Sequence, residues 1–446
     1  MITIANGTVL YGQDLVAKKS NILIDDGKII EISDTVNEGE IIDATDCIVC
    51  PSFLNAHTHI GDSIVKDIGD GKSIEEIVKP PNGLKHLALS NSSDDEIING
   101  MTQSMWDMLE TGTTHFIDYR EGGLSGVKLL KEASKNIPIT PIILGRDDSF
   151  YGEDPDLQNV KIAIKKLLKV CDGIAPSGFG EISDEVAILI VSECEKKNKI
   201  SSIHVGEYES LQIDSLNKTG KTEIQRAVDC GFNQLIHCVS PMKDDLDLIV
   251  KNNKNVVLSP RSNGTFSLGI PPLLDFLKKG IKPLIGTDNI MINSPNIFRE
   301  LEYTLKAMRA YYKTFVDPVE ILKMATTNIT VDTSINDSSN TSVNDSSNTS
   351  VNVTVDASIN TSINTSKNIN TKTSKSINAN KKGDFGIIKS YSIEEKINKS
   401  IIEEGHFAEL FISKKLSKNP YLSLINRTEK NDIKYLINKN EILEYN

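Results

Sequence analysis

The feature that most constrains the fold is a regular alternation of short apolar runs and longer amphipathic segments between about residues 50 and 327. The first run leads into His57-Thr-His59, and the seven others lie at Thr113–Asp118, Ile137–Leu144, Gly173–Pro176, Ile200–His204, Gln234–His237, Val256–Ser259 and Pro283–Asp288. Short apolar runs separated by helical patterns are typical of parallel βα units. Eight such units predict an α/β fold of the (β/α)8 TIM-barrel type.

Two helix starts support this interpretation. Ser183 is a good N-cap for a helix from Asp184 to Lys197, and Asp317-Pro318 combines an N-cap with a proline at the first helical position. An open doubly wound sheet is the alternative architecture. Because no Gly-x-Gly-x-x-Gly follows the first strand, the sequence does not favour dinucleotide binding.

The two ends of the chain differ from the middle. Residues 1–50 are expected to form short antiparallel strands, with hairpin signals at Asn6-Gly7 and Asp26-Gly27. Strand patterns return at Gly383–Ile388 and Phe407–Ile412. We therefore expect a small β-sandwich domain built from residues 1–50 and 383–446, with the hydrolase barrel at 51–327.

Residues 328–382 are rich in Asn, Ser and Thr, and a segment beginning Asn336-Asp-Ser-Ser recurs from Asn344. Such a segment has too little apolar surface to offset its ordering entropy, which predicts a disordered insertion. Its sequence indicates no role.

Charge and composition limit the partners. The formal net charge is −12 and 39% of the residues are hydrophobic. An acidic chain does not favour nucleic acid or an anionic membrane as partner. Neither a signal peptide nor an apolar stretch long enough to span a membrane is visible. Together with cysteines scattered in no disulfide pattern, these features predict a cytoplasmic protein.

Cys47 and Cys50 form a Cys-x-x-Cys, which could indicate a redox pair or half of a zinc site. Residues three apart on a strand face opposite sides, so the two thiols are expected to diverge. Buried strand cysteines are therefore the favoured interpretation.

Chemistry-bearing residues gather at the ends of the expected strands. His57 and His59 are spaced i, i+2, which places both imidazoles on one side of a strand. His204, His237 and Asp288 end three further runs. The carboxyl ends of barrel strands are where such enzymes place their active sites. Imidazoles with a carboxylate suit one divalent metal, Zn²⁺ first and Fe²⁺ second.

These residues resemble the amidohydrolase superfamily, in particular its cytosine and adenosine deaminase-like branch. Pro51-Ser-Phe-Leu-Asn-Ala-His-Thr-His is similar to the family's Pro-Gly-x-x-Asn-x-His-x-His, with Ser52 where glycine is usual. Gly286-Thr-Asp288 is similar to its strand-eight motif, and His204-Val-Gly-Glu207 resembles the branch's His-x-x-Glu.

The resemblance implies roles for individual residues. His57, His59, His204 and Asp288 would bind the metal, Glu207 would shuttle protons, and His237 would orient the attacking water. Asp288 would also accept a proton. Binuclear relatives add a lysine at strand four. That strand has none here, since Lys169 precedes it, so a single metal is favoured.

Weaker candidates for substrate contact lie elsewhere after the strands: His86, Arg120, Arg146, Ser177, Arg261 and Asn263. Arginines there would suit an anionic or carbonyl-bearing substrate, and ordinary ion pairing is the equal alternative.

The expected function is metal-dependent hydrolysis of a non-peptide carbon–nitrogen bond, namely deamination of a nucleobase, nucleoside or pterin-like heterocycle. A hydrolase of cyclic amides, cyclic amidines or halogenated heterocycles of the same superfamily is the first alternative, and a non-catalytic barrel scaffold is the second. The expected partner is a small-molecule substrate, and barrels of this kind often form homodimers or higher homo-oligomers.

Overall fold

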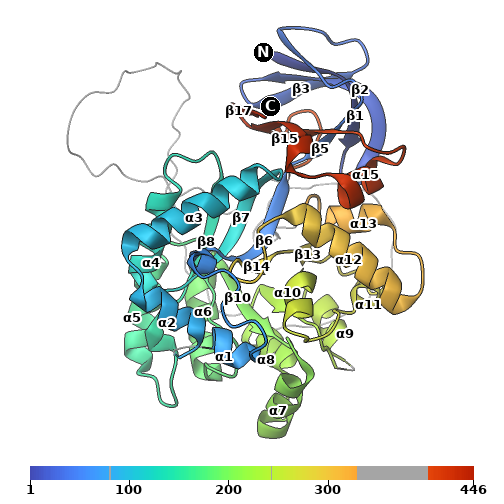
Figure 1. Ribbon diagram of the computed structural model, residues 1–446. Helices are drawn as coiled ribbons and strands as arrows, with labels where there is room; N and C mark the ends of the chain where they lie inside the picture. Colours follow the sequence, from blue (N-terminus) through green and yellow to red (C-terminus); the bar gives the residue numbers. More distant parts are fainter. Residues whose placement is uncertain (80–81, 243, 329–399, 446) are drawn as a thin grey trace, which may run out of the picture. The chain divides into compact units, whose positions relative to one another are not determined.

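The computed structural model describes residues 1–79, 82–242, 244–328 and 400–445. The predicted disordered insertion, except Asn328, and the strand expected at Gly383–Ile388 lie outside the described residues. The described part contains two separate β-sheets and the helices that pack on them (Figure 1).

The larger sheet is parallel throughout. Its strands, in spatial order, are β13 (Leu284–Ile285), β12 (Asn255–Leu258), β11 (Gln234–His237), β10 (Ile200–Val205), β9 (Gly173–Ile174), β8 (Thr140–Gly145), β7 (Thr113–Arg120), β6 (Phe53–His59) and β14 (Asp288–Asn289). The α/β class and the parallel sheet predicted from the apolar runs are confirmed. Both ends of this order come from the eighth run, because β13 pairs with β12 while β14 pairs with β6.

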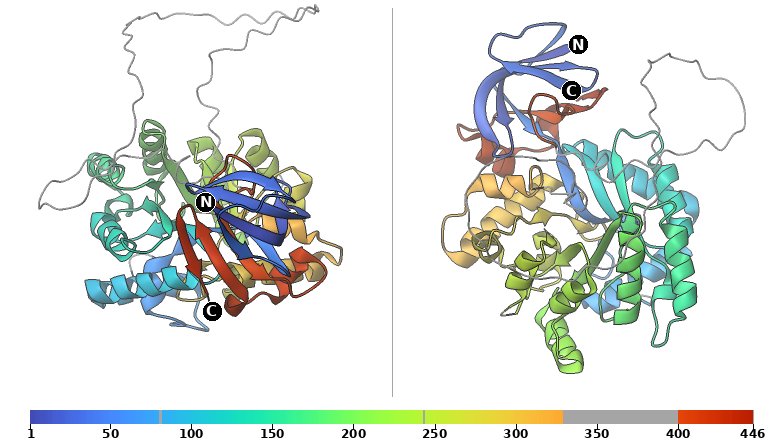
Figure 2. Two further views of the ribbon diagram at one scale, coloured as in Figure 1. Left: turned by 90° about the horizontal axis from the view of Figure 1, so that it is seen from above. Right: turned by 180° about the vertical axis from the view of Figure 1, so that it is seen from behind.

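Helices surround this sheet on its outer side (Figures 1 and 2). The described helices are α1 (Ile74–Val78), α2 (Leu84–Asn91), α3 (Asp94–Leu109), α4 (Gly123–Ala133), α5 (Leu157–Leu167), α6 (Asp184–Glu195), α7 (Glu209–Thr219), α8 (Glu223–Cys230), α9 (Asp245–Lys251), α10 (Pro260–Thr265), α11 (Leu273–Lys278), α12 (Ile297–Tyr312), α13 (Pro318–Lys323) and α15 (Pro420–Arg427). Both predicted N-caps are confirmed: Ser183 accepts from the Val186 amide, and Asp317 accepts from the Val319 amide.

The smaller sheet combines the two ends of the chain, as predicted. Its main path is β17 (Glu441–Glu444), β16 (Ile433–Asn438), β15 (Glu409–Lys414), β5 (Cys47–Pro51), β1 (Ile2–Tyr11), β2 (Val16–Asp25) and β3 (Lys28–Ser33), with β4 (Glu40–Asp43) beside β1. The expectation of a purely antiparallel unit was wrong, because β1 runs parallel to both β4 and β5.

One of the two expected hairpins is absent from this sheet. Asp26-Gly27 does turn the chain between β2 and β3, with positive φ at both residues. Asn6-Gly7 instead forms an irregularity inside the continuous strand β1, where Asn6 has φ 65°. A side chain at Gly7 would place its Cβ 2.7 Å from Val49 on β5, so glycine serves close strand packing there.

The first apolar run divides between the two sheets. β5 belongs to the smaller sheet, while β6 begins the parallel sheet. Cys47 packs into the core of the smaller sheet and Cys50 into the main core, so the two thiols diverge as expected. All six cysteines are free. No helix among the described residues is long and apolar enough to cross a membrane.

Candidate functional site

Four histidines and one aspartate meet at the carboxyl ends of the parallel strands. His57 and His59 end β6, and their ring centroids are 5.0 Å apart. The rings of His204 at the end of β10 and of His237 at the end of β11 lie 5.0 and 5.5 Å from the His57 ring. Asp288 begins β14. Potential ligand atoms lie within 4.8 Å of one another in two groups, His57/His59/His204 and His57/His237/Asp288.

Asp288 is the anionic member of this cluster. Its Oδ1 lies 3.1 Å from His57 Nε2 and 3.6 Å from His59 Nε2, and its Oδ2 accepts a hydrogen bond from Ser262 Oγ at 2.5 Å. Burial alone would raise its pKa, but the adjacent imidazoles hold the pKa of Asp288 well below its usual value. The residue therefore offers a carboxylate.

The cluster fits a divalent metal ion. Both ring nitrogens of His57 are buried and neither makes a well-directed hydrogen bond among the described residues, although Asp288 Oδ1 lies 3.1 Å from Nε2. His59 Nδ1 lies 3.0 Å from Glu121 Oε1, and His204 Nδ1 lies 3.3 Å from the Ser177 carbonyl oxygen. Such contacts fix each ring through Nδ1 and leave Nε2 as an electron-pair donor. A buried imidazole without a partner is costly unless a ligand satisfies it.

Glu207 lies beside the cluster, two residues beyond β10. Its Oε1 is 3.3 Å from His237 Nε2. Burial and the nearby Asp288 carboxylate raise the pKa of Glu207 well above its ordinary value. Burial lowers the pKa of His237 to about 4, so its imidazole is neutral near pH 7. This pair can therefore store and pass a proton.

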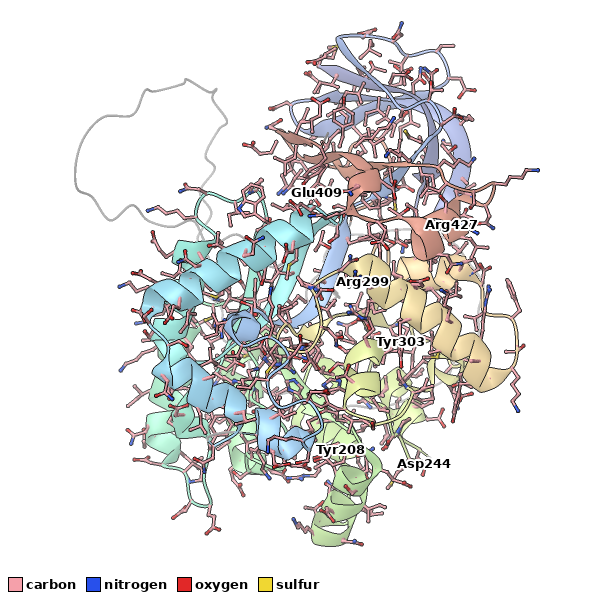
Figure 3. All side chains as sticks on the ribbon, viewed as in Figure 1. Tyr208, Asp244, Arg299, Tyr303, Glu409 and Arg427 are labelled. Carbon is pink, nitrogen blue, oxygen red and sulfur yellow. The ribbon has the colours of Figure 1, made fainter. Side chains whose placement is uncertain are left out.

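A cavity of about 120 Å³ opens onto these residues. Besides members of the cluster, it is lined by acidic side chains and a tyrosine from the following loops and helices: Glu75, Glu181, Glu223 and Tyr208. Tyr208 Oη donates to Glu75 at 2.7 Å, beside α1 (Figure 3). The cavity lining also includes two basic side chains, Lys85 and Arg146.

Three of the weaker candidates adjoin this site. Arg146 and Ser177 line the cavity, and Arg146 Nη1 donates to Ser177 Oγ at 3.1 Å. Asn263 does not line the cavity, but it contacts His237, with Nδ2 3.4 Å from His237 Nδ1.

The other three candidates are engaged elsewhere and do not line the cavity. His86 Nε2 lies 3.0 Å from the Val78 carbonyl oxygen. Arg120 pairs with Glu121 at 2.6 Å, and Arg261 lies 3.6 Å from Glu300. Arg120 and Arg261 thus make the ion pairs considered as the alternative.

Sequence reasoning missed two buried charges next to the cluster, Lys85 and Glu121. Glu121 contacts His59, Lys85 and Arg146. Glu121 directly follows a strand end, which is a weak signal. Lys85 lies on a helix far from any strand and carries no sequence signal.

Comparison with known families gives one match that covers most of the chain. The model of the Amidohydrolase family matches residues 48–330. A protein of Methanothermobacter thermautotrophicus, named only as an aminohydrolase with no substrate given, is 40% identical over 445 residues, covering 100% of this chain and 99% of the relative.

Two more distant similarities carry named substrates. The 5-methylthioadenosine/S-adenosylhomocysteine deaminase of Thermoanaerobacter pseudethanolicus is 26% identical over 328 residues, which is 70% of this chain and 75% of that protein. The crystal structure of atrazine chlorohydrolase from Arthrobacter aurescens, complexed with zinc, superposes with a TM-score of 0.74 at 16% identity, covering 100% and 95% of the two chains. The latter shows a shared fold.

Proposed function

The chain belongs to the amidohydrolase family, and from that premise we propose that it is a metal-dependent aminohydrolase that deaminates an aminated heterocycle. The observation that carries this proposal is that four donors, His57, His59, His204 and Asp288, lie beside Glu207 and His237, and that all six residues except His57 line one cavity. The deaminase named among the relatives supports an adenine-type nucleoside as the first substrate class to test.

We assign the metal to His57, His59, His204 and Asp288. Three imidazoles and a carboxylate suit Zn²⁺, with Fe²⁺ as the second choice. A single ion is favoured because β9 carries no lysine, and Lys169 is exposed on the segment before it. When bound, a divalent metal lowers the pKa of a coordinated water toward ~7.

Side chains of the protein carry out the proton transfers. Hydrolysis adds water across the carbon–nitrogen bond, forms a ring carbonyl and releases ammonia. Asp288 accepts one proton from the attacking water at its carboxylate. Glu207, whose raised pKa favours the protonated form, donates its proton to the ring nitrogen. It then takes the remaining proton of the added hydroxyl and passes it to the leaving amine as the ring carbonyl forms, and the proton held by Asp288 finally returns to Glu207. His237 donates or accepts at Nε2, next to Glu207, and orients the water.

We further propose that the parallel sheet is a closed (β/α)8 barrel. β13 and β14 are separated by two residues of one segment, and they pair with opposite ends of the strand order. Together with the match over residues 48–330, this supports a hydrolase domain at 51–327 and a small β-domain at 1–50 and 383–446. A β-sandwich form for the small domain stays a prediction.

The direct test is ammonia release by zinc-loaded protein over a panel of aminopurines, their nucleosides, aminopyrimidines and aminopterins. Glu207→Gln should keep the metal and lose turnover by about 100-fold or more, since proton transfer is worth that much. Zinc content and ammonia release would be measured on both proteins.

Other outcomes separate the alternatives. Chloride release or ring opening without ammonia would favour a halo-heterocycle or cyclic-amide hydrolase. A zinc-replete protein that turns over none of these compounds would favour a non-catalytic scaffold. Undiminished turnover in Glu207→Gln would remove this residue from the mechanism.

A further inference from the structure

Lys85 on α2 is a buried cation that the mechanism above does not use. Its residue exposure is only 1%. Nζ lies 2.6 Å from Glu121 Oε1, 2.9 Å from Asn289 Oδ1 and 3.3 Å from Asp62 Oδ2. A lysine ammonium has three N–H donors. Glu121 and Asn289 lie within hydrogen-bond distance of Nζ, whereas Asp62 is an ion-pair partner whose Oδ2 accepts no hydrogen bond among the described residues. The ammonium is thus held by protein groups although Lys85 lines the cavity.

Glu121, the first of these partners, connects Lys85 to His59. Glu121 is buried and pairs with three cationic side chains, Lys85 at 2.6 Å, Arg120 at 2.6 Å and Arg146, which favour its carboxylate form. An ionised carboxylate only accepts hydrogen bonds, so His59 Nδ1, 3.0 Å away, must be the donor. The electron pair of His59 then sits on Nε2, on the side of Asp288.

Asn289, the second of these partners, connects Lys85 to Asp288. Because Asn289 Oδ1 accepts from Lys85, the amide nitrogen of Asn289 is turned the other way. That nitrogen donates to Asp288 Oδ1 at 2.9 Å. The orientation of the Asn289 amide is thus set by Lys85, and the orientation of the Asp288 carboxylate is set by Asn289.

We infer that Lys85 is a positioning residue that holds His59, through Glu121, and Asp288, through Asn289, in the orientation that binds the metal. This inference rests on the proposed metal site. Arg120 and Arg146 also pair with Glu121, but among the described residues only Lys85 contacts both Glu121 and Asn289.

The test compares cobalt affinity of the wild type and Lys85→Met by competition with a chelator. Loss of positioning should weaken binding by about 10- to 100-fold, as for other groups that orient ligands. The visible spectrum of bound Co²⁺ should also change. A purely electrostatic role gives the opposite sign, because removing a positive charge beside a cation would tighten binding.

Lys323→Met is the matched control. Lys323 on α13 is also partly buried, with 15% side-chain exposure, and has two carboxylate partners, Asp14 and Glu320, each at 3.1 Å. It does not line the cavity. Its replacement should lower the melting temperature of the metal-free protein but leave the cobalt dissociation constant unchanged.

The cobalt affinities of Lys85→Met and of the wild type test two different claims, the positioning role of Lys85 and the proposed function. Unchanged or tighter cobalt binding by Lys85→Met overturns the inference, whereas a wild type that binds no cobalt overturns the proposed function itself. If Lys85→Met does not fold, Glu121→Gln tests the link to His59 and Asn289→Ala tests the link to Asp288. Several-fold weaker binding in both supports the inference, and wild-type affinity in either contradicts it.

Discussion

Glu300 on α12 shows how a single buried carboxyl group can hold a neighbouring helix that contacts the site. It is fully buried, and its Oε1 accepts the Arg261 backbone amide at 2.9 Å. Arg261 lies on α10, which also carries Ser262, the hydroxyl donor to Asp288. The contact fixes the start of α10. Ser262, the residue after Arg261, donates to Asp288, a proposed metal ligand. Burial raises the pKa of Glu300 to about 7, from an ordinary 4.5.

This shift predicts a pH dependence of stability. Between about pH 4.5 and 7 the folded state keeps a proton on Glu300 that the unfolded state has lost. The contribution to stability is therefore full below about pH 4.5 and is lost as the pH rises to about 7. The change is up to about 3 kcal/mol. Glu300→Gln should lose this dependence, as measured by urea unfolding at pH 5 and pH 8.

A control for other titrating groups is the wild type at the same two pH values. The unfolding free energy of Glu300→Gln relative to the wild type should increase from pH 5 to pH 8. Equal differences at both values would show that Glu300 titrates normally.

At this scale the sequence was informative only where residues follow strands. His57, His59, His204, His237 and Asp288 end apolar runs, and a parallel sheet brings such ends to one edge. Lys85 could not be found in this way, because one of its partners, Asn289, is 204 residues away and helix periodicity gives no reason to bury a lysine. Buried ion networks depend on tertiary contacts that a local pattern does not contain.

At the scale of elements, the approach of the β13–β14 segment to β6 determines where His57 lies. Asn55 on β6 exchanges hydrogen bonds with Thr287, accepting from its amide and donating to its hydroxyl. A Cβ on Gly286 would lie 2.4 Å from the His57 backbone nitrogen. The glycine is therefore required by a close approach between strands rather than by backbone conformation.

Gly286→Ala should push β6 and the segment between β13 and β14 apart. We expect a loss of about 1–3 kcal/mol in stability, the usual cost of overpacking, together with weaker zinc binding because His57 moves. Melting temperature and zinc affinity would be measured. Gly180→Ala is the control, since a Cβ there meets nothing within 4 Å. Equal zinc affinity in both variants would contradict this account of Gly286.

Element types were predictable and some local details were not. The alternation of runs and helices predicted the parallel sheet because each unit must bury its apolar strand. Asn6-Gly7 was misread because the same dipeptide that favours a hairpin also suits a bulge, and the choice depends on β5, about 40 residues later. Tertiary packing decided between two locally acceptable structures.

For the whole molecule, the described residues on either side of 329–399 lie away from the site. Asn328 donates to the carbonyl of Pro283, which precedes β13, and Ser400 lies 3.3 Å from Ser52, which precedes β6. Both anchors lie at the amino-terminal edge of the parallel sheet. The proposed metal ligands lie at its carboxyl-terminal edge.

Replacing residues 336–380 with a Gly/Ser linker of about ten residues should therefore leave metal binding and turnover unchanged. Zinc content and the rate of ammonia release of the shortened chain would be compared with those of the full chain. A large fall in turnover with intact folding would assign the segment a role at the active site.

The most direct measurement is a crystal structure of the zinc-loaded protein with anomalous data at the zinc edge. We predict one strong peak, about 2.0–2.2 Å from nitrogen atoms of His57, His59 and His204 and from a carboxylate oxygen of Asp288. A zinc peak away from these residues, or Asp288 and His204 turned from the bound ion, would contradict it.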